Sequence, residues 1–224
     1  MDNIPKAYDQ LGQWNSLMFL YSSALKEINV KIEILNNEFI HIYNYTPIEH
    51  VKSRLKTAES IVKKMKRHNY EVTIANMKDR LSDIAGIRII CSFTSDIYLI
   101  ADMIARQKDV TVLYVKDYIK HPKPNGYKSY HMVVTIPVYL SDGPVETKVE
   151  IQIRTVAMDF WASLEHKIYY KFEGEGPAYL QQELKACADV VCEDMVDILE
   201  GKMYSLNETI LAWNSQRDQR GTAS

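Results

Sequence analysis

Residues 149–154 alternate apolar and polar side chains without a break. Such alternation predicts a β-strand whose apolar side chains face a core while its polar side chains project together from the other face. The inward residues are then Val149, Ile151 and Ile153, and the outward residues are Glu150, Gln152 and Arg154. A solvent-exposed sheet more often carries threonine or lysine, whereas a carboxylate, an amide and a guanidinium together suit a site for a metal and phosphates. This strand makes the chain a candidate enzyme.

Both ends of the chain have helical periodicity. Apolar residues recur at steps of three and four over residues 14–39 and 184–198, which predicts a long helix in each region. The first of these apolar seams could pack on the sheet of its own domain or against another subunit. Residues 47–68 are expected to form a second helix, with Thr46 as N-cap and Pro47 at its first position.

The segment between these helices reads as an α+β unit. After a polar loop over residues 69–82, a helix is expected at 97–106 and another from Thr155 to Tyr170, with a hairpin turn at 141–144. The expected strands span residues 86–93, 110–118, 131–136 and 146–154. This order predicts an α+β fold in which helices cover a small mixed β-sheet.

Composition excludes some classes of protein. A net charge of −2 over 224 residues argues against a duplex-DNA binder, which usually carries a strong basic excess. The N-terminal residues lack the order of a secretory signal, and no apolar run is long enough to span a bilayer. We therefore expect a cytoplasmic protein that does not interact with membranes.

Three groups of residues could carry chemistry. Lys56, Ser60 and Lys64 are spaced four apart, so on the expected second helix they would form one stripe suited to a polyphosphate, or else an ordinary solvated face. Asp83 precedes a strand, and with Glu150 it could hold one Mg²⁺ that also keeps waters and substrate phosphates. A surface ion pair between Asp83 and Arg88 is the alternative.

The third group is the loop at residues 125–131. Tyr127 follows a glycine that permits a tight turn, so its ring could stack on a base while Lys128 and His131 contact phosphate or ribose. The alternative is a hairpin turn with a packed tyrosine.

Taken in chain order, these segments resemble the synthetase domain of the Rel-type (p)ppGpp synthetases, and the lack of further domains resembles the small alarmone synthetases. The matching motifs are Arg54-x-Lys56-x-x-x-Ser60-x-x-x-Lys64, Asp83-Ile84-Ala85-Gly86-Ile87-Arg88, Lys116-Asp117-Tyr118-Ile119, the stretch from Pro122 to His131, Glu150-Ile151-Gln152-Ile153-Arg154-Thr155, and the stretch from Met158 to His166. Single motifs are weak, but this many in one order are highly specific.

The resemblance implies a nucleotidyltransferase-like fold and transfer of the β,γ-pyrophosphate of ATP to the ribose 3′-hydroxyl of GDP or GTP. It implies that Asp83 and Glu150 hold Mg²⁺, and that Glu150 takes the proton of that hydroxyl. ATP would be bound by Arg54 and Arg88 around the adenine and by Lys56, Ser60 and Lys64 along the triphosphate. The implied GDP or GTP site comprises Lys116, Lys123, Tyr127, Lys128, His131, Gln152 and Asp159.

Two of these positions differ from the pattern of some relatives. Lys116 stands where some relatives carry arginine. An arginine could contact a phosphate through two hydrogen bonds, whereas a lysine offers a single point charge. Asp159 stands where others carry asparagine, and a carboxylate there could accept hydrogen bonds from both N1–H and the N2 amino group of guanine.

The resemblance also implies an organisation of the chain. A catalytic part over residues 47–171 would lie between helical extensions at 1–46 and 172–224. Two apolar seams in the extensions, together with the family, predict a homotetramer whose central cleft could bind a nucleotide or single-stranded RNA effector. The open alternatives are a catalytically silent or RNA-binding regulatory relative, and a pyrophosphokinase that acts on adenine nucleotides or tRNA.

Overall fold

The structure is a computed structural model that describes residues 6–171, 178–189, 201–203, 205–206 and 209. Its helices are α1 (Lys6–Tyr43), α2 (Ala58–Arg67), α3 (Ile74–Arg80), α4 (Thr94–Ala105), α5 (Val156–Lys171) and α6 (Ala178–Asp189). Its strands are β1 (Ile48–Leu55), β2 (Ala85–Cys91), β3 (Thr111–Asp117), β4 (Tyr130–Leu140) and β5 (Gly143–Thr155). In these described ranges, no helix is long and apolar enough to cross a membrane.

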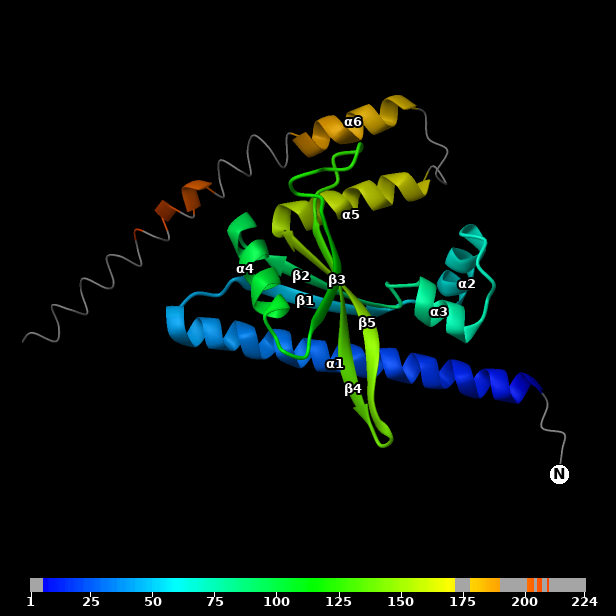
Figure 1. Cartoon of the computed structure of the whole chain (residues 1–224). Coiled ribbons are helices and arrows are strands. Elements are labelled where there is room, and N and C mark those ends of the chain that lie inside the picture. Colours follow the sequence, from blue (N-terminus) through cyan, green and yellow to red (C-terminus); the bar gives the residue numbers. More distant parts are fainter. Residues whose placement is uncertain (1–5, 172–177, 190–200, 204, 207–208, 210–224) are drawn as a thin grey trace, which may run out of the picture.

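The strands form one mixed sheet in the order β1-β2-β5-β4-β3. Only β2 and β5 pair in parallel, and the other neighbours are antiparallel. The long helix α1 runs across one side of this sheet (Figure 1) and shares a core with α4. The predicted α+β fold, a mixed sheet flanked by helices with a long N-terminal helix, is therefore confirmed.

The alternation that predicted β5 is confirmed as well. Val149, Ile151 and Ile153 are completely buried in the core that α1 and α4 cover. On the opposite face of β5 the polar side chains follow one another, and Arg154 among them is almost completely buried. One side of the sheet is thus committed to the core, and the other is available for a site.

The expected helix over residues 47–68 is wrong in its first half. Residues 48–55 form β1, which pairs with the edge of β2, and helix α2 begins only at Ala58, where the Thr57 hydroxyl accepts a hydrogen bond from the Ser60 amide as N-cap. A bulge between Ile48 and His50 inserts one extra residue. Because of it, both Ile48 and Val51 pack on the core, and the resulting spacing of three imitates a helix.

Other boundaries agree more closely. The remaining strands and α4 begin and end within four residues of their expected limits, and the hairpin turn joins β4 to β5 as predicted. The segment 69–82, expected to be a loop, contains the short helix α3, which Thr73 caps through its hydroxyl. Most of the apolar seam expected over 184–198 lies outside the described residues.

The apolar seam of α1 packs on the sheet of its own chain. The seam residues buried in the core are Tyr21, Leu25, Ile28, Ile32 and Leu35, and beside them Leu17, Leu20 and Ala24 are buried as well. This settles the alternative left open by the sequence, because the seam is not free to contact another subunit. The outer side of α1 nevertheless exposes Phe19, Val30 and Ile34, at 62%, 52% and 60% of their surface.

Candidate active site

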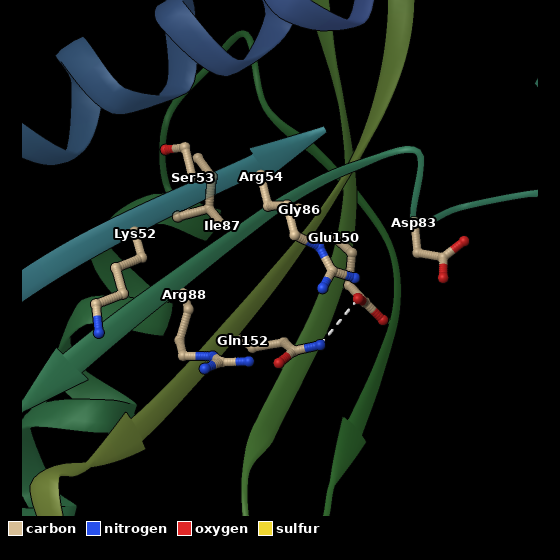
Figure 2. A pocket seen from close by; sticks show the side chains of 9 residues that line it. All are labelled: Lys52, Ser53, Arg54, Asp83, Gly86, Ile87, Arg88, Glu150 and Gln152. Carbon is tan, nitrogen blue, oxygen red and sulfur yellow. Dashed lines mark hydrogen bonds between the residues drawn. The ribbon is translucent and has the colours of Figure 1, made fainter. Parts of the chain in front are cut away.

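The face of the sheet opposite α1 carries a cavity of about 400 Å³. The parallel pairing of β2 and β5 aligns Gly86 with Glu150 and Arg88 with Gln152, so polar side chains from two distant segments lie side by side. Figure 2 shows them with residues of β1 along one wall. The lining residues are Lys52, Ser53, Arg54, Asp83, Gly86, Ile87, Arg88, Glu150 and Gln152.

Two lysines converge on Asp83. The Nζ atoms of Lys56 and Lys64 both donate to its Oδ2, and the distance from Lys64 is 2.7 Å. Burial by itself raises the pKa of Asp83, but the hydrogen bonds and charges of the two lysines outweigh it and lower the pKa below its usual value. The other oxygen, Oδ1, is buried and accepts no hydrogen bond from the described residues.

Glu150 is held as an anion from its own side of the cavity. Its Oε2 accepts a hydrogen bond of 3.0 Å from Gln152 Nε2, and His131 Nδ1 lies 3.7 Å from its Oε1. Burial raises the pKa of Glu150, but His131 and Gln152 together lower it by more. The pKa of Glu150 is therefore below its usual value. The negative charge of Asp83 acts in the opposite direction, as expected for two carboxylates that face one cavity.

The structure separates the predicted triphosphate residues. Lys56 lies before α2 rather than on it, and Ser60 stays in the exposed first turn, where its hydroxyl accepts a hydrogen bond from Thr57. The expected helical stripe is therefore wrong for Lys56, because the strand β1 ends just before it. Lys56 and Lys64 still meet, since both reach the carboxylate of Asp83.

The alternative surface ion pair between Asp83 and Arg88 does not form. Arg88 instead donates from Nη1 to Oδ1 of Asp159 at 3.1 Å, with its side chain 38% exposed. Arg54 and Arg88 both line the cavity (Figure 2). The two arginines predicted for the adenine are thus on adjacent strands of one wall.

A second group of residues surrounds Tyr127 beside the cavity. Gly126 has a φ of +83°, which favours glycine, and its turn brings the Tyr127 hydroxyl to 2.8 Å from His131 Nε2. Lys123 Nζ lies 4.6 Å from the centre of the Tyr127 ring. Burial lowers the pKa of His131 despite the neighbouring Glu150.

Two further predicted residues lie at the margin of this group. Lys116, on the edge strand β3, pairs in register with His131 but is exposed, and its Nζ lies 5.5 Å from the centre of the Tyr114 ring. Lys128 is half-buried. Neither residue lines the cavity.

Arg154 connects these groups and was not among the predicted binding residues, although the alternation of β5 placed it on this face. Its guanidinium donates to the hydroxyl of Tyr127, to Oε1 of Gln152 at 3.0 Å, to Oδ1 of Asp159 at 3.1 Å and to Ser129 Oγ at 3.3 Å. The signal that could have found it was its place beside Glu150 and Gln152 on the polar face of the alternating strand.

Comparison with known proteins identifies the family. A family profile described as the region found in RelA / SpoT proteins matches residues 53–175, which is more than half of the chain. This chain belongs to the RelA/SpoT family. The matched region begins inside β1 and extends past the end of α5, so it contains both carboxylates and both groups of basic and aromatic residues.

Individual relatives resemble the chain over nearly its whole length. The GTP pyrophosphokinase YwaC of Bacillus subtilis is 48% identical over 200 residues, which cover 89% of this chain and 93% of that protein. The crystal structure of small alarmone synthetase 2 from Bacillus subtilis superposes with a TM-score of 0.74 at 43% identity, covering 88% of this chain and 98% of the other. The structure of small alarmone synthetase 1 from the same organism, bound to its product pppGpp, gives a TM-score of 0.76 at 33% identity with the same coverage. Within the RelA/SpoT family, the chain is therefore similar over most of its length to small alarmone synthetases.

Proposed function

We propose that the protein is a cytoplasmic pyrophosphokinase that transfers the β,γ-pyrophosphate of ATP to the 3′-hydroxyl of GDP or GTP. The observation that carries the proposal is the pair of carboxylates, Asp83 and Glu150, on the wall of one cavity. The same cavity is lined by three cationic side chains, those of Lys52, Arg54 and Arg88. Family membership, the names of the relatives and the pppGpp bound to one of them support the same reaction.

The carboxylates fit a divalent cation, which we propose to be Mg²⁺. Asp83 Oδ1 is a buried acceptor with no hydrogen bond in the described part of the chain, and Glu150 faces the same cavity. No group of three or more His, Cys, Asp or Glu side chains suited to a metal occurs among the described residues. Two carboxylates with substrate phosphates and waters are the usual ligands of Mg²⁺. When bound, the ion would neutralise charge that develops on the transferred phosphates.

In the proposed reaction, the ribose 3′-oxygen attacks the β-phosphorus of ATP. The bond from that phosphorus to the oxygen bridging it to the α-phosphate breaks, and AMP leaves with that oxygen. The 3′-hydroxyl proton goes to the carboxylate of Glu150, which its neighbours hold in the ionised form that accepts a proton. Gln152 donates to Oε2 of this carboxylate and so orients it.

The remaining side chains would bind the two nucleotides. We propose that Arg54 and Arg88 stack on the adenine and that Lys56 and Lys64, with Ser60, bind the triphosphate. For the acceptor, Tyr127 would stack on the guanine, and Lys123, Lys128, His131 and Lys116 would contact its phosphates and ribose. Asp159 and Gln152 complete the proposed acceptor site. In the free protein the two lysines are held by Asp83, so they would turn towards the triphosphate as it binds.

The purified protein, incubated with ATP, Mg²⁺ and one acceptor at a time, tests the proposal. GDP or GTP should give AMP and ppGpp or pppGpp, whereas ADP and tRNA should give no product. A folded protein that transfers nothing to any acceptor would indicate a silent or RNA-binding regulatory relative. Transfer to ADP or tRNA alone would assign a different acceptor to the same chemistry.

We further propose a homotetramer, with a catalytic part at residues 47–171 and helical extensions on both sides. The seam of α1 is used within the chain, so the support is the exposed apolar set Phe19, Val30 and Ile34 on its outer side. Light scattering should give about four times the chain mass of 25.9 kDa, and a mass near that of one chain would refute the assembly. A cleft between subunits could then take a nucleotide or single-stranded RNA effector.

A further inference from the structure

Asp159 lies between two arginines that belong to different parts of the site. Its Oδ1 accepts a hydrogen bond from Nη1 of Arg88 on β2 and another from Nη1 of Arg154 on β5, each at 3.1 Å. The Asp159 side chain is 14% exposed and that of Arg154 is 5% exposed. Both bonds are charge-assisted. The bond to Arg154 is largely shielded from water, whereas the Arg88 side chain is 38% exposed.

Arg88 is itself one of the residues proposed to stack on a base, and Arg154 contacts another, Tyr127. Within the described part of the chain, Asp159 is the one hydrogen-bond partner of the Arg88 guanidinium, whose buried Nε has none. On the other side, Arg154 lies 5.0 Å from the centre of the Tyr127 ring and donates to the Tyr127 hydroxyl. A continuous series of contacts therefore runs from Arg88 through Asp159 and Arg154 to Tyr127.

We infer that Asp159 is a positioning residue for both nucleotides, in addition to any contact with guanine. This inference rests on the proposed function, in which Arg88 stacks on adenine and Tyr127 on guanine. A guanidinium stacks best when its orientation is restrained. Asp159 restrains the Arg88 guanidinium at one edge, through Nη1, and leaves its flat face available. Through Arg154, the same carboxylate fixes the ring of Tyr127.

The charges make Asp159 difficult to replace. Burial lowers the pKa of Arg88 and the positive charge of Arg154 lowers it further, whereas the charge of Asp159 raises it. The carboxylate thus offsets the repulsion between the two cations. Asparagine has the same shape but no charge, so Asp159→Asn leaves two cations close together with one weak acceptor. Oδ1 is committed to both arginines, so a guanine that engaged both carboxylate oxygens would have to compete with these bonds.

Binding of a donor analogue in the absence of any acceptor tests the inference. Isothermal titration calorimetry with α,β-methylene-ATP and Mg²⁺ would compare the wild type with Asp159→Asn. We expect binding to weaken about three- to tenfold, the size of a partly exposed charge-assisted hydrogen bond. Removal of a negative charge favours an anionic ligand, so weaker binding cannot arise from net charge. Unchanged or tighter binding of the analogue, with only GDP affected, would overturn the inference.

A matched control and a double-mutant cycle separate positioning from folding. Asp102→Asn removes an exposed carboxylate of α4 that pairs with Arg106, the residue just after this helix, and it should leave binding of the analogue unchanged. If Asp159 acts through Arg88, Asp159→Asn should have no further effect in an Arg88→Met background. An effect that persists undiminished there would overturn the inference. Product formation by the wild type tests the proposed function separately, because the wild type can be active whether or not Asp159 positions Arg88.

Discussion

The paired lysines at Asp83 support a prediction about stability and its dependence on pH. In the double variant Lys56→Met, Lys64→Met, the Asp83 carboxylate loses both of its hydrogen-bond donors. The side chains of Lys56, Lys64 and Asp83 are 13%, 25% and 18% exposed, so water replaces the lost bonds only in part. From the penalty of leaving a partly buried charge unpaired, we expect a loss of about 2 kcal/mol. For a chain of this length this corresponds to a melting temperature lower by about 4–8 °C.

The loss should depend on pH with a definite sign. The lysines lower the pKa of Asp83 in the folded wild type, so its stabilising contribution is present at neutral pH and is lost as the pH falls through that lowered value. Without the lysines, burial raises the pKa of Asp83. The variant is therefore less stable than the wild type at neutral pH, and it regains stability when Asp83 is protonated. The stability difference should therefore be largest at pH 7 and narrow towards about pH 4.

Thermal melting followed by circular dichroism, without nucleotide and with a chelator present, measures this difference. Lys63→Met is the matched control, because Lys63 is an exposed neighbour on the same helix, and it should melt as the wild type at each pH. A deficit in the double variant that stays constant from pH 7 to about pH 4 would refute the role assigned to Asp83.

Three further predictions concern catalysis and the acceptor loop. Glu150→Gln should lower transfer by a factor of about a hundred to ten thousand while the protein stays folded, and near-native turnover would contradict the proposed proton acceptor. Tyr127→Ala should weaken GDP and GTP by about 1–3 kcal/mol and ATP far less in titrations, whereas an equal loss would make Tyr127 a structural residue. Gly126→Ala should weaken GDP and lower the melting temperature, because its φ is +83° and an added Cβ would lie 2.4 Å from that of Ala188; an unchanged protein would show that the loop adapts.

Local patterns in the sequence predicted the parts of the fold that depend on local structure. The alternation of β5 gave both its core face and its polar face, because a strand has a side-chain period of two. The same kind of pattern gave a wrong prediction for β1, because the bulge at Ile48–His50 gives this strand the apolar spacing of a helix. The short helix α3 was missed because seven residues carry too little periodicity to be recognised.

The candidate site, too, was predictable from the sequence only in part. The motifs identified Asp83 and Glu150, which the fold brings to one cavity. They could not predict that Lys56 and Lys64 share Asp83, or that Arg88 pairs with Asp159, because these contacts depend on how distant elements pack. Arg154 has no local signal beyond its position on the polar face of β5, and its role is visible only from its four hydrogen-bond partners.

The parallel pairing of β2 with β5 has a consequence for how the protein is made. Asp83 precedes β2, but its partner carboxylate is on β5, and the chain must first build α4, β3 and β4 before that strand exists. During synthesis, β2 has no neighbour on that edge until residue 150 has left the ribosome. A chain interrupted before this point carries one carboxylate and an unpaired strand edge. In the mechanism proposed above, incomplete chains would therefore be inactive, and cleavage within the β4–β5 hairpin would separate the two carboxylates onto different fragments.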